Sequence, residues 1–279
     1  LGPEVPPSLP SHLTPGHRVQ RPDRLELARW LVSPTNPLPA RVTVNRLWQQ
    51  FFGLGLVKTS EDFGLQGERP SHPELLDGLA LEFIESGWDV KALVRSIVLS
   101  STYRQSSQTS PEIRERDPEN RRLTRGPRFR MPSPMIRDMT LASAGLLTER
   151  VGGAAVNPYQ PAGVWEETTF GNKRYTQDHG EALYRRSLYV FWRRIIGPTL
   201  FFDVANRQTC TVKTPRTNVP LHALLTLNDT GYVEAARVLA QQVLASESRD
   251  PERLAQIFLK ILGRRPRPAE SQILLEGLR

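Results

Sequence analysis

The sequence contains a single cysteine, Cys210, and this scarcity excludes one class of small extracellular fold. A lone cysteine forms no internal disulfide, so the chain is not a disulfide-stabilised scaffold, although its cellular compartment stays open. The sequence also lacks a Cys-x-x-Cys-His motif, which excludes covalent attachment of c-type haem in this segment. We therefore expect no cofactor within these residues.

Long apolar runs are missing as well. No stretch approaches the roughly 20 apolar residues that a membrane-spanning helix requires, so we expect no membrane span. What the chain has instead is 279 residues, of which 38% are hydrophobic. Such a chain is long enough to bury one large core or two smaller ones.

Lysine is scarce, because only five of the 37 lysines and arginines are lysines, in a chain with a net charge of +8. Arginine binds phosphate, sulfate or carboxylate through two hydrogen bonds, and it also pairs with acids inside proteins. The arginines are spread along the chain without a long basic run. This distribution favours solvated or salt-bridged arginines over a polyanion-binding surface, and nucleic-acid binding is disfavoured because no aromatic and basic residues interleave.

The composition changes along the chain and predicts its organisation. Residues 1–21 are rich in proline and predict an extended linker to an upstream domain. Residues 22–104 predict an N-terminal helical subdomain, and the polar segment 105–130 predicts a connector. Residues 131–279 predict a C-terminal helical subdomain with an irregular loop at 151–180. The predicted fold is mainly α, with packed helical subdomains, a loop-rich middle and at most a small strand pair.

Local signals place several helix ends. Apolar spacing predicts helices at 24–31 and 40–52. Ser71 and Glu74 have the spacing of a capping box, and Asp89 is a predicted N-cap. Further along the chain, Ser133 and Pro134 are predicted to open one helix, and Asn218 and Pro220 another. β-forming side chains predict a short strand at 187–194, and Asp229 and Asp250 are predicted N-caps.

Reactive side chains gather in residues 202–229. Cys210, His222 and Asp203 provide a thiol, an imidazole and a carboxylate, which are the groups of nucleophilic catalysis. Nearby cations lower the pKa of a thiol and make it reactive, whereas a half-buried structural cysteine is inert. Both interpretations of Cys210 stay open, and we predict that His222 points into packing.

The same segment carries a candidate anion site. Arg207, Lys213 and Arg216 precede the helix expected near Asn218, and free amides at a helix N-terminus favour negative charge. The competing interpretation is internal pairing of these cations, for example with Asp203 and Asp229.

Other polar residues give weaker signals. The five histidines show neither i, i+4 pairing nor cysteine partners at zinc spacing, so we predict no metal site, with Asp178 and His179 as the remaining possibility. Glu166 and Glu167 are either a general acid/base pair or solvent-facing residues. His72 is either an exposed ligand or a residue of a helix-entry turn.

A family resemblance adds to these observations. The motifs NPLPARVTVNRLWQQFF, SHPELLDGLALEFIESGWDVKALVRSIVLSSTYR, PAGVWE, RRSLYVFWRR, FDVANRQTC and TNVPLHALLTLND occur in this order. Over about residues 22–279 the chain resembles the family called domain of unknown function fifteen fifty-three, which is abundant in planctomycete bacteria. The stretch MPSPM at 131–135 departs from the acidic, alanine-containing helix start of that family.

The resemblance implies a periplasmic or secreted protein of several domains. Its relatives carry c-type cytochrome modules upstream, so haem c is expected in those modules and not here. We expect an accessory binding or interaction module that partners with the upstream domains and binds a polysaccharide or another polyanion. The alternatives are an enzyme using Cys210 and His222 or the carboxylates of residues 160–180, and a nucleic-acid-binding protein.

Overall fold

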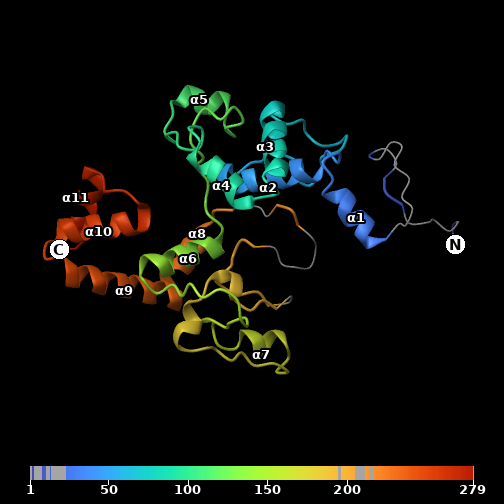
Figure 1. The fold of residues 1–279 in the computed structure, drawn as a ribbon. Coiled ribbons are helices and arrows are strands. Elements are labelled where there is room, and N and C mark those ends of the chain that lie inside the picture. Colours follow the sequence, from blue (N-terminus) through green and yellow to red (C-terminus); the bar gives the residue numbers. More distant parts are fainter. Residues whose placement is uncertain are drawn as a thin grey trace. The chain divides into compact units, whose positions relative to one another are not determined.

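The computed structural model describes residues 2, 8–10, 13, 23–193, 196–204, 211–213 and 217–278. The chain divides into two compact units, Leu1–Phe129 and Arg130–Arg279. The mainly α prediction is confirmed, because the described residues form helices joined by loops and contain only two isolated β-bridges (Figure 1). The predicted linker at 1–21 lies almost entirely outside the described residues.

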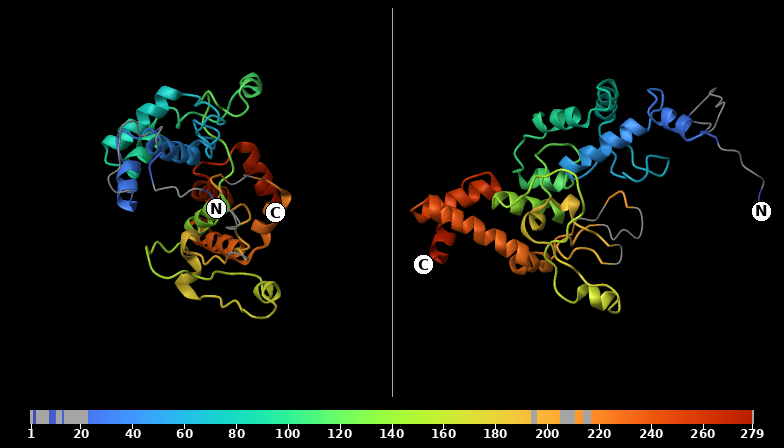
Figure 2. Two further views of the ribbon diagram at one scale, coloured as in Figure 1. Left: turned by 90° about the vertical axis from the view of Figure 1, so that its right-hand side faces the viewer. Right: turned by 60° about the horizontal axis from the view of Figure 1, so that its bottom comes forward.

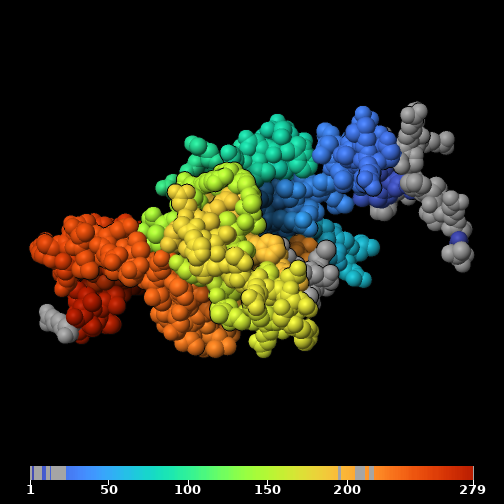
Figure 3. Space-filling model, turned by 90° about the horizontal axis from the view of Figure 1, so that it is seen from below, coloured from blue at the N-terminus to red at the C-terminus, as the bar shows by residue number. Residues whose placement is uncertain are grey.

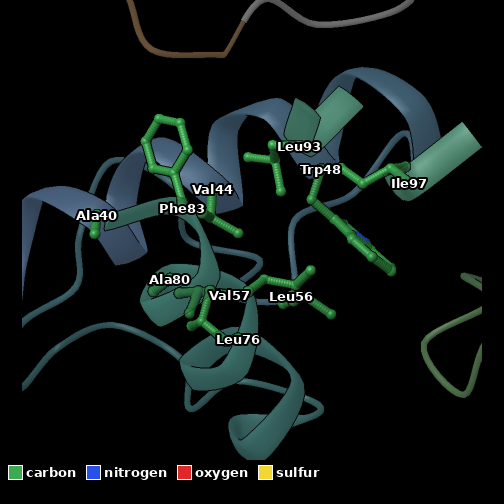
Figure 4. Packing of buried hydrophobic residues seen from close by; sticks show 11 residues of the cluster. Ala40, Val44, Trp48, Leu56, Val57, Leu76, Ala80, Phe83, Leu93 and Ile97 are labelled. Carbon is green, nitrogen blue, oxygen red and sulfur yellow. The ribbon is translucent and has the colours of Figure 1, made fainter. Parts of the chain in front are cut away.

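Three of the helices of unit 1, α2 (Pro39–Phe52), α3 (Pro73–Glu85) and α4 (Val90–Leu99), pack together through apolar side chains and form its core. The unit also contains α1 (Arg24–Leu31) and α5 (Pro111–Arg116). The predicted helices at 24–31 and 40–52 are confirmed. Val44 and Trp48 of α2, Phe83 of α3 and Ile97 of α4 are buried in one core (Figure 4). Burying each large apolar side chain stabilises the fold by roughly 1.5–3 kcal/mol.

A buried asparagine fixes the loop that follows α2. Asn45 is completely buried, and its amide group accepts from the backbone N–H of Val57 at 2.8 Å and donates to the carbonyl of Val57 at 3.0 Å. A Cβ atom at Gly55 would lie only 2.6 Å from the Asn45 side chain, so the loop needs glycine there. The sequence pattern gave no indication of this polar contact inside an apolar core.

The predicted caps of unit 1 have mixed outcomes. Asp89 caps α4 as predicted, accepting from the amides of Lys91 and Ala92. The capping box at Ser71 is wrong, because α3 begins at Pro73 and its N-cap residue is His72, which makes no capping bond. The Ser71 hydroxyl lies 3.0 Å from Nδ1 of His72 instead.

The polar segment 105–130 folds almost entirely with unit 1. It forms the short helix α5, and its Arg121 donates to the carbonyl of Gly55 at 3.1 Å. Lys58 pairs with Glu119 at 2.8 Å. The boundary between the two units falls near the end of this segment, between Phe129 and Arg130.

Unit 2 combines long helices with an irregular middle. Its helical elements are α6 (Ser133–Ser143), α7 (Val164–Thr168), η2 (Gly180–Tyr184), η3 (Ser187–Tyr189), α8 (Pro220–Asn228), α9 (Thr230–Ser246), α10 (Asp250–Leu262) and α11 (Pro268–Gly277). The helix predicted at Ser133 and Pro134 is confirmed. α9 packs against α6, α8 and α10 (Figure 2), and α10 and α11 lie together (Figure 3).

A buried arginine organises the irregular part of unit 2. Arg137 on α6 donates to the carbonyls of Arg185 and Leu183, each at 2.8 Å. Burial lowers the pKa of Arg137, while the nearby carboxylate of Asp138 favours its charged form. Asp138 also accepts from the amide and the hydroxyl of Ser187. These contacts tie η3 to α6.

Two local predictions for unit 2 are wrong, and one is confirmed. The strand predicted at 187–194 begins as the 3-10 helix η3, since Asp138 holds Ser187 and no neighbouring strand is present among the described residues. Asp250 is the first residue of α10 rather than its cap, and it pairs with Arg253. Asp229 caps α9 as predicted, through the amide of Gly231 at 2.8 Å.

Candidate functional site

Arg130 connects two of the predicted site residues. Its Nη2 forms a short charge-assisted hydrogen bond with the carboxylate of Asp203, and its Nη1 lies 2.9 Å from Nδ1 of His222. Asp203 follows the buried Phe201, whereas His222 lies in the first turn of α8. The guanidinium therefore joins a carboxylate and an imidazole that are 19 positions apart in the sequence.

Asp203 anchors the N-terminus of α6. Its Oδ1 accepts from the backbone amide of Ser133 at 2.9 Å and from the Ser133 hydroxyl at 2.6 Å, and only 2% of its side chain is exposed. Burial by itself raises the pKa of the carboxyl, but the hydrogen bonds from Ser133 and the Arg130 guanidinium outweigh it and lower the pKa of Asp203. The site thus holds an ionised carboxylate at a helix N-terminus, where negative charge is stabilised.

The contact with Arg130 fixes the protonation pattern of His222. A guanidinium can only donate hydrogen bonds, so Nδ1 of His222 is an acceptor and the neutral ring carries its proton on Nε2. The imidazole also stacks on Phe202, with ring centroids 4.2 Å apart. The ring is therefore held on one edge and one face, and it offers an N–H donor at Nε2.

These groups line an open cleft of about 430 Å³ within unit 2. Arg130, Phe202, His222 and Asn218 contribute to its wall, together with residues of α6, α8 and α9. The remaining lining residues are Ile136, Thr140, Ala223, Thr226, Tyr232 and Ala236. A cleft of this size accommodates a small ligand such as one sugar unit.

Two residues of the predicted anion site, Lys213 and Asn218, lie among the described residues. Asn218 is exposed and lies just before α8, whose N-cap residue Val219 makes no side-chain capping bond. Lys213 is exposed and makes no ion pair with any residue that the structure describes. Cys210, Arg207 and Arg216 lie outside the described residues.

Arg130 is the member of this cluster that the sequence interpretation missed. It ends the polar segment that was predicted to be a connector, and 73 positions separate it from Asp203. No local spacing predicts a contact over such a distance.

The other predicted residues lie elsewhere. Glu166 and Glu167 belong to the five-residue helix α7, and within the described part of the chain neither makes an ion pair. His179 is exposed, and the described residues contain no group of three or more histidine, cysteine, aspartate or glutamate side chains suited to a metal ion. The ring of His72 forms a hydrogen bond with the hydroxyl of its neighbour Ser71.

Comparison with known proteins places the chain in a family. No curated protein and no solved structure shows a significant match. Residues 23–278 match the family described as PSD1, protein of unknown function (DUF1553). This range covers most of both units and all residues that line the cleft, and the chain therefore belongs to the DUF1553 family.

Proposed function

We propose that this chain is a ligand-binding module and that the cleft at Arg130, His222 and Asn218 binds an acidic sugar unit of a polysaccharide. The observation that supports this proposal most directly is the 2.9 Å contact between Arg130 and Nδ1 of His222. It makes His222 a fixed hydrogen-bond donor in the wall of the cleft. A carboxylate or a related anion is the natural acceptor for such a donor.

The remaining lining residues fit the rest of a sugar. The hydroxyl of Thr140 donates to the carbonyl of Ile136 and that of Thr226 donates to the carbonyl of Ala223, each at 2.8 Å. Both hydroxyl oxygens are thereby left as acceptors for ligand hydroxyl groups. Ile136, Ala223 and Ala236 offer apolar surface to a sugar ring. An acidic sugar matches this combination of a few polar groups with an apolar wall.

The N-terminus of α8 adds to the preference for an anion. Val219 provides no capping side chain, and Pro220 has no N–H. The amide of His222 donates to the carbonyl of Val219 at 3.0 Å, so the amide of Leu221 and the positive end of the helix dipole are what this helix start offers near Asn218. Free amides at a helix N-terminus favour negative charge. Arg207 and Arg216, which the sequence predicts for this anion site, lie outside the described residues.

The geometry of His222 argues against the enzymatic alternative in its simplest form. A histidine that activates a thiol through Nε2 must carry its proton on Nδ1, and that proton normally points to a carboxylate or a carbonyl. Here Nδ1 faces Arg130, and Asp203 pairs with the guanidinium instead of the ring. We therefore propose binding rather than base catalysis by His222. Ordinary reactivity of Cys210 toward iodoacetamide at neutral pH would agree with this.

The wider context also belongs to this proposal. Its support is the family resemblance, which suggests a secreted or periplasmic protein with upstream cytochrome modules. The described residues include no helix with the length and apolar character needed to cross a membrane. In that setting the module would position a polysaccharide near the upstream domains.

Calorimetric titration with oligogalacturonate, and with a neutral oligosaccharide of equal length, tests the proposal. His222→Phe keeps a ring to stack on Phe202 but removes the Nε2–H donor, so affinity for the acidic ligand should fall about tenfold. His179→Phe, at an exposed histidine, is the matched control and should bind like the wild type. Absence of acidic-oligosaccharide binding at low salt, or unchanged affinity in His222→Phe, would refute the proposal.

A further inference from the structure

Unit 2 contains a second cavity, of about 250 Å³, that shares no lining residue with the His222 cleft. Two segments form it, residues 148–156 and residues 178–185. A bridge between Thr148 and Arg185 and a hydrogen bond from the amide of Thr148 to the carbonyl of Tyr184 join these segments. Arg150 and Glu181 are exposed, so solutes can reach the cavity.

Arg185 brings a buried positive charge to this cavity. It is 6% exposed, and its Nη atoms donate to the carbonyls of Ala154, Arg150 and Gly152. No described carboxylate lies within ion-pair distance, and the face of Tyr189, 3.8 Å from the guanidinium, offsets only part of the charge. Buried charges are normally paired, so Arg185 is an exception that calls for a counter-ion.

Two of the five N–H donors of Arg185 have no partner among the described residues. The Nε atom is buried without a hydrogen bond. Nη1 makes a single hydrogen bond, to Ala154, which leaves its second N–H free because a guanidinium nitrogen of this type carries two. The free donor at Nη1 belongs to the atom that faces Gly153.

The guanidinium groups of Arg185 and Arg150 both lie near Gly153. A Cβ atom at Gly153 would lie 3.7 Å from Nη1 of Arg185 and 3.8 Å from Nη2 of Arg150. Gly153 also has a φ of 90°, which residues with side chains rarely adopt. Glycine therefore leaves open the space between the two cations, and Arg150 makes no ion pair with the described residues.

Two carboxylates define the other side of the cavity. Asp178 accepts from the amide of Asn157 at 2.7 Å, and Glu181 is exposed. Both line the cavity with the two arginines. Carboxylates only accept hydrogen bonds, so they disfavour a bare multivalent anion but bind the hydroxyl groups of a larger ligand.

We infer that this cavity is a second binding site, which takes a phosphate or sulfate group carried on a hydroxylated ligand. The oxyanion lies between the guanidinium groups of Arg150 and Arg185 over Gly153. Asp178 and Glu181 accept from the hydroxyl groups. Paired arginines suit such groups because guanidinium donors match the geometry of their oxygens. This inference does not depend on the His222 cleft.

Amide resonances of the full chain, followed by NMR at constant ionic strength, test the site with inorganic phosphate, inorganic sulfate, glucose 6-phosphate and glucose. We expect saturable shifts at Gly152, Gly153 and Ala154 with glucose 6-phosphate, weaker ones with the inorganic ions and none with glucose. Arg150→Gln should weaken the sugar phosphate about tenfold or more, because it removes a charge-assisted hydrogen bond. Arg265→Gln, an exposed arginine on the loop before α11, carries the same charge change and should have no effect.

Several outcomes would overturn the inference. Shifts that do not saturate, or that spread over the surface, indicate an adventitious ion only. Equal weakening in Arg150→Gln and Arg265→Gln indicates attraction by the net charge of the chain rather than a site. His222→Phe should leave glucose 6-phosphate binding unchanged, so a loss of binding there would mean that the ligand occupies the other cleft. The experiments can thus refute the proposal for one site and still support the proposal for the other.

Discussion

Replacing Asp203 with asparagine tests whether this carboxylate anchors unit 2. The asparagine side chain keeps the shape of the aspartate and leaves an oxygen for Ser133, but its amide group presents N–H donors to Arg130. The change therefore removes the ion pair with Arg130 and the negative charge at the N-terminus of α6. Arg130 also loses the acceptor that orients its guanidinium toward His222.

The expected cost follows from these losses. A hydrogen bond to a charged group contributes roughly 1.5–3 kcal/mol, and the charge at the helix end adds about 0.3–1 kcal/mol. Arg130 keeps 20% of its side chain exposed, so water compensates part of the loss. We expect the free energy of unfolding of unit 2 to fall by about 2–3 kcal/mol. For a unit of about 150 residues this lowers its Tm by roughly 4–12 °C.

Scanning calorimetry and hydrogen exchange of the full chain measure this effect. The transition of unit 2 should move down, and amides at the start of α6 should exchange faster than in the wild type. Asp250→Asn is the matched control, since Asp250 is more than half exposed in its pair with Arg253 and should cost less than about 1 kcal/mol. A Tm shift no larger than that of the control, with unchanged exchange in α6, would refute the anchoring role.

Three further predictions concern pH and packing. Folding lowers the pKa of Asp203, so the stability that its carboxylate contributes is complete above about pH 4 and is lost as the pH falls through the folded pKa. The difference in Tm between the wild type and Asp203→Asn should therefore narrow below about pH 4, and a constant difference would contradict this. Asn45→Ala leaves the backbone N–H and carbonyl of Val57 without the partners that Asn45 provides. The free energy of unfolding of unit 1, measured in urea, should fall by about 2–5 kcal/mol, and a fall below about 1 kcal/mol would show that water replaces the contact. The carboxyl of Glu270, hydrogen-bonded by Arg264, should titrate by NMR with a pKa of about 2, and Arg264→Gln should raise that pKa; an unmoved titration would exclude Arg264 as its cause.

The sequence by itself determined most of the helices. Apolar residues at helical spacing located the helices at 24–31 and 40–52, because periodic burial needs no knowledge of the partner surface. Asp89 and Asp229 were recognisable as caps because a cap bonds to amides within three residues. The family was also recognisable, since its motifs are ordered stretches of sequence.

Local patterns failed where a tertiary contact or one neighbouring residue decided the outcome. The β-forming side chains at 187–194 could not reveal that Asp138 would hold Ser187 in a 3-10 turn. The spacing of Ser71 and Glu74 suggested a capping box, but Pro73 moved the helix start by one residue. Both cases show that a propensity is a weak preference which a specific contact outweighs.

Only the tertiary structure decided how the candidate sites are composed. Asp203 and His222 were visible as residue types, yet their contacts depend on Arg130, which comes from another part of the chain, pairs with the carboxylate and donates to Nδ1 of the imidazole. The arginines over Gly153 are likewise 35 positions apart. Hydrogen bonds and charges act over a few ångströms of space, whatever the separation in sequence, so their partners are known only once the backbone has brought them together.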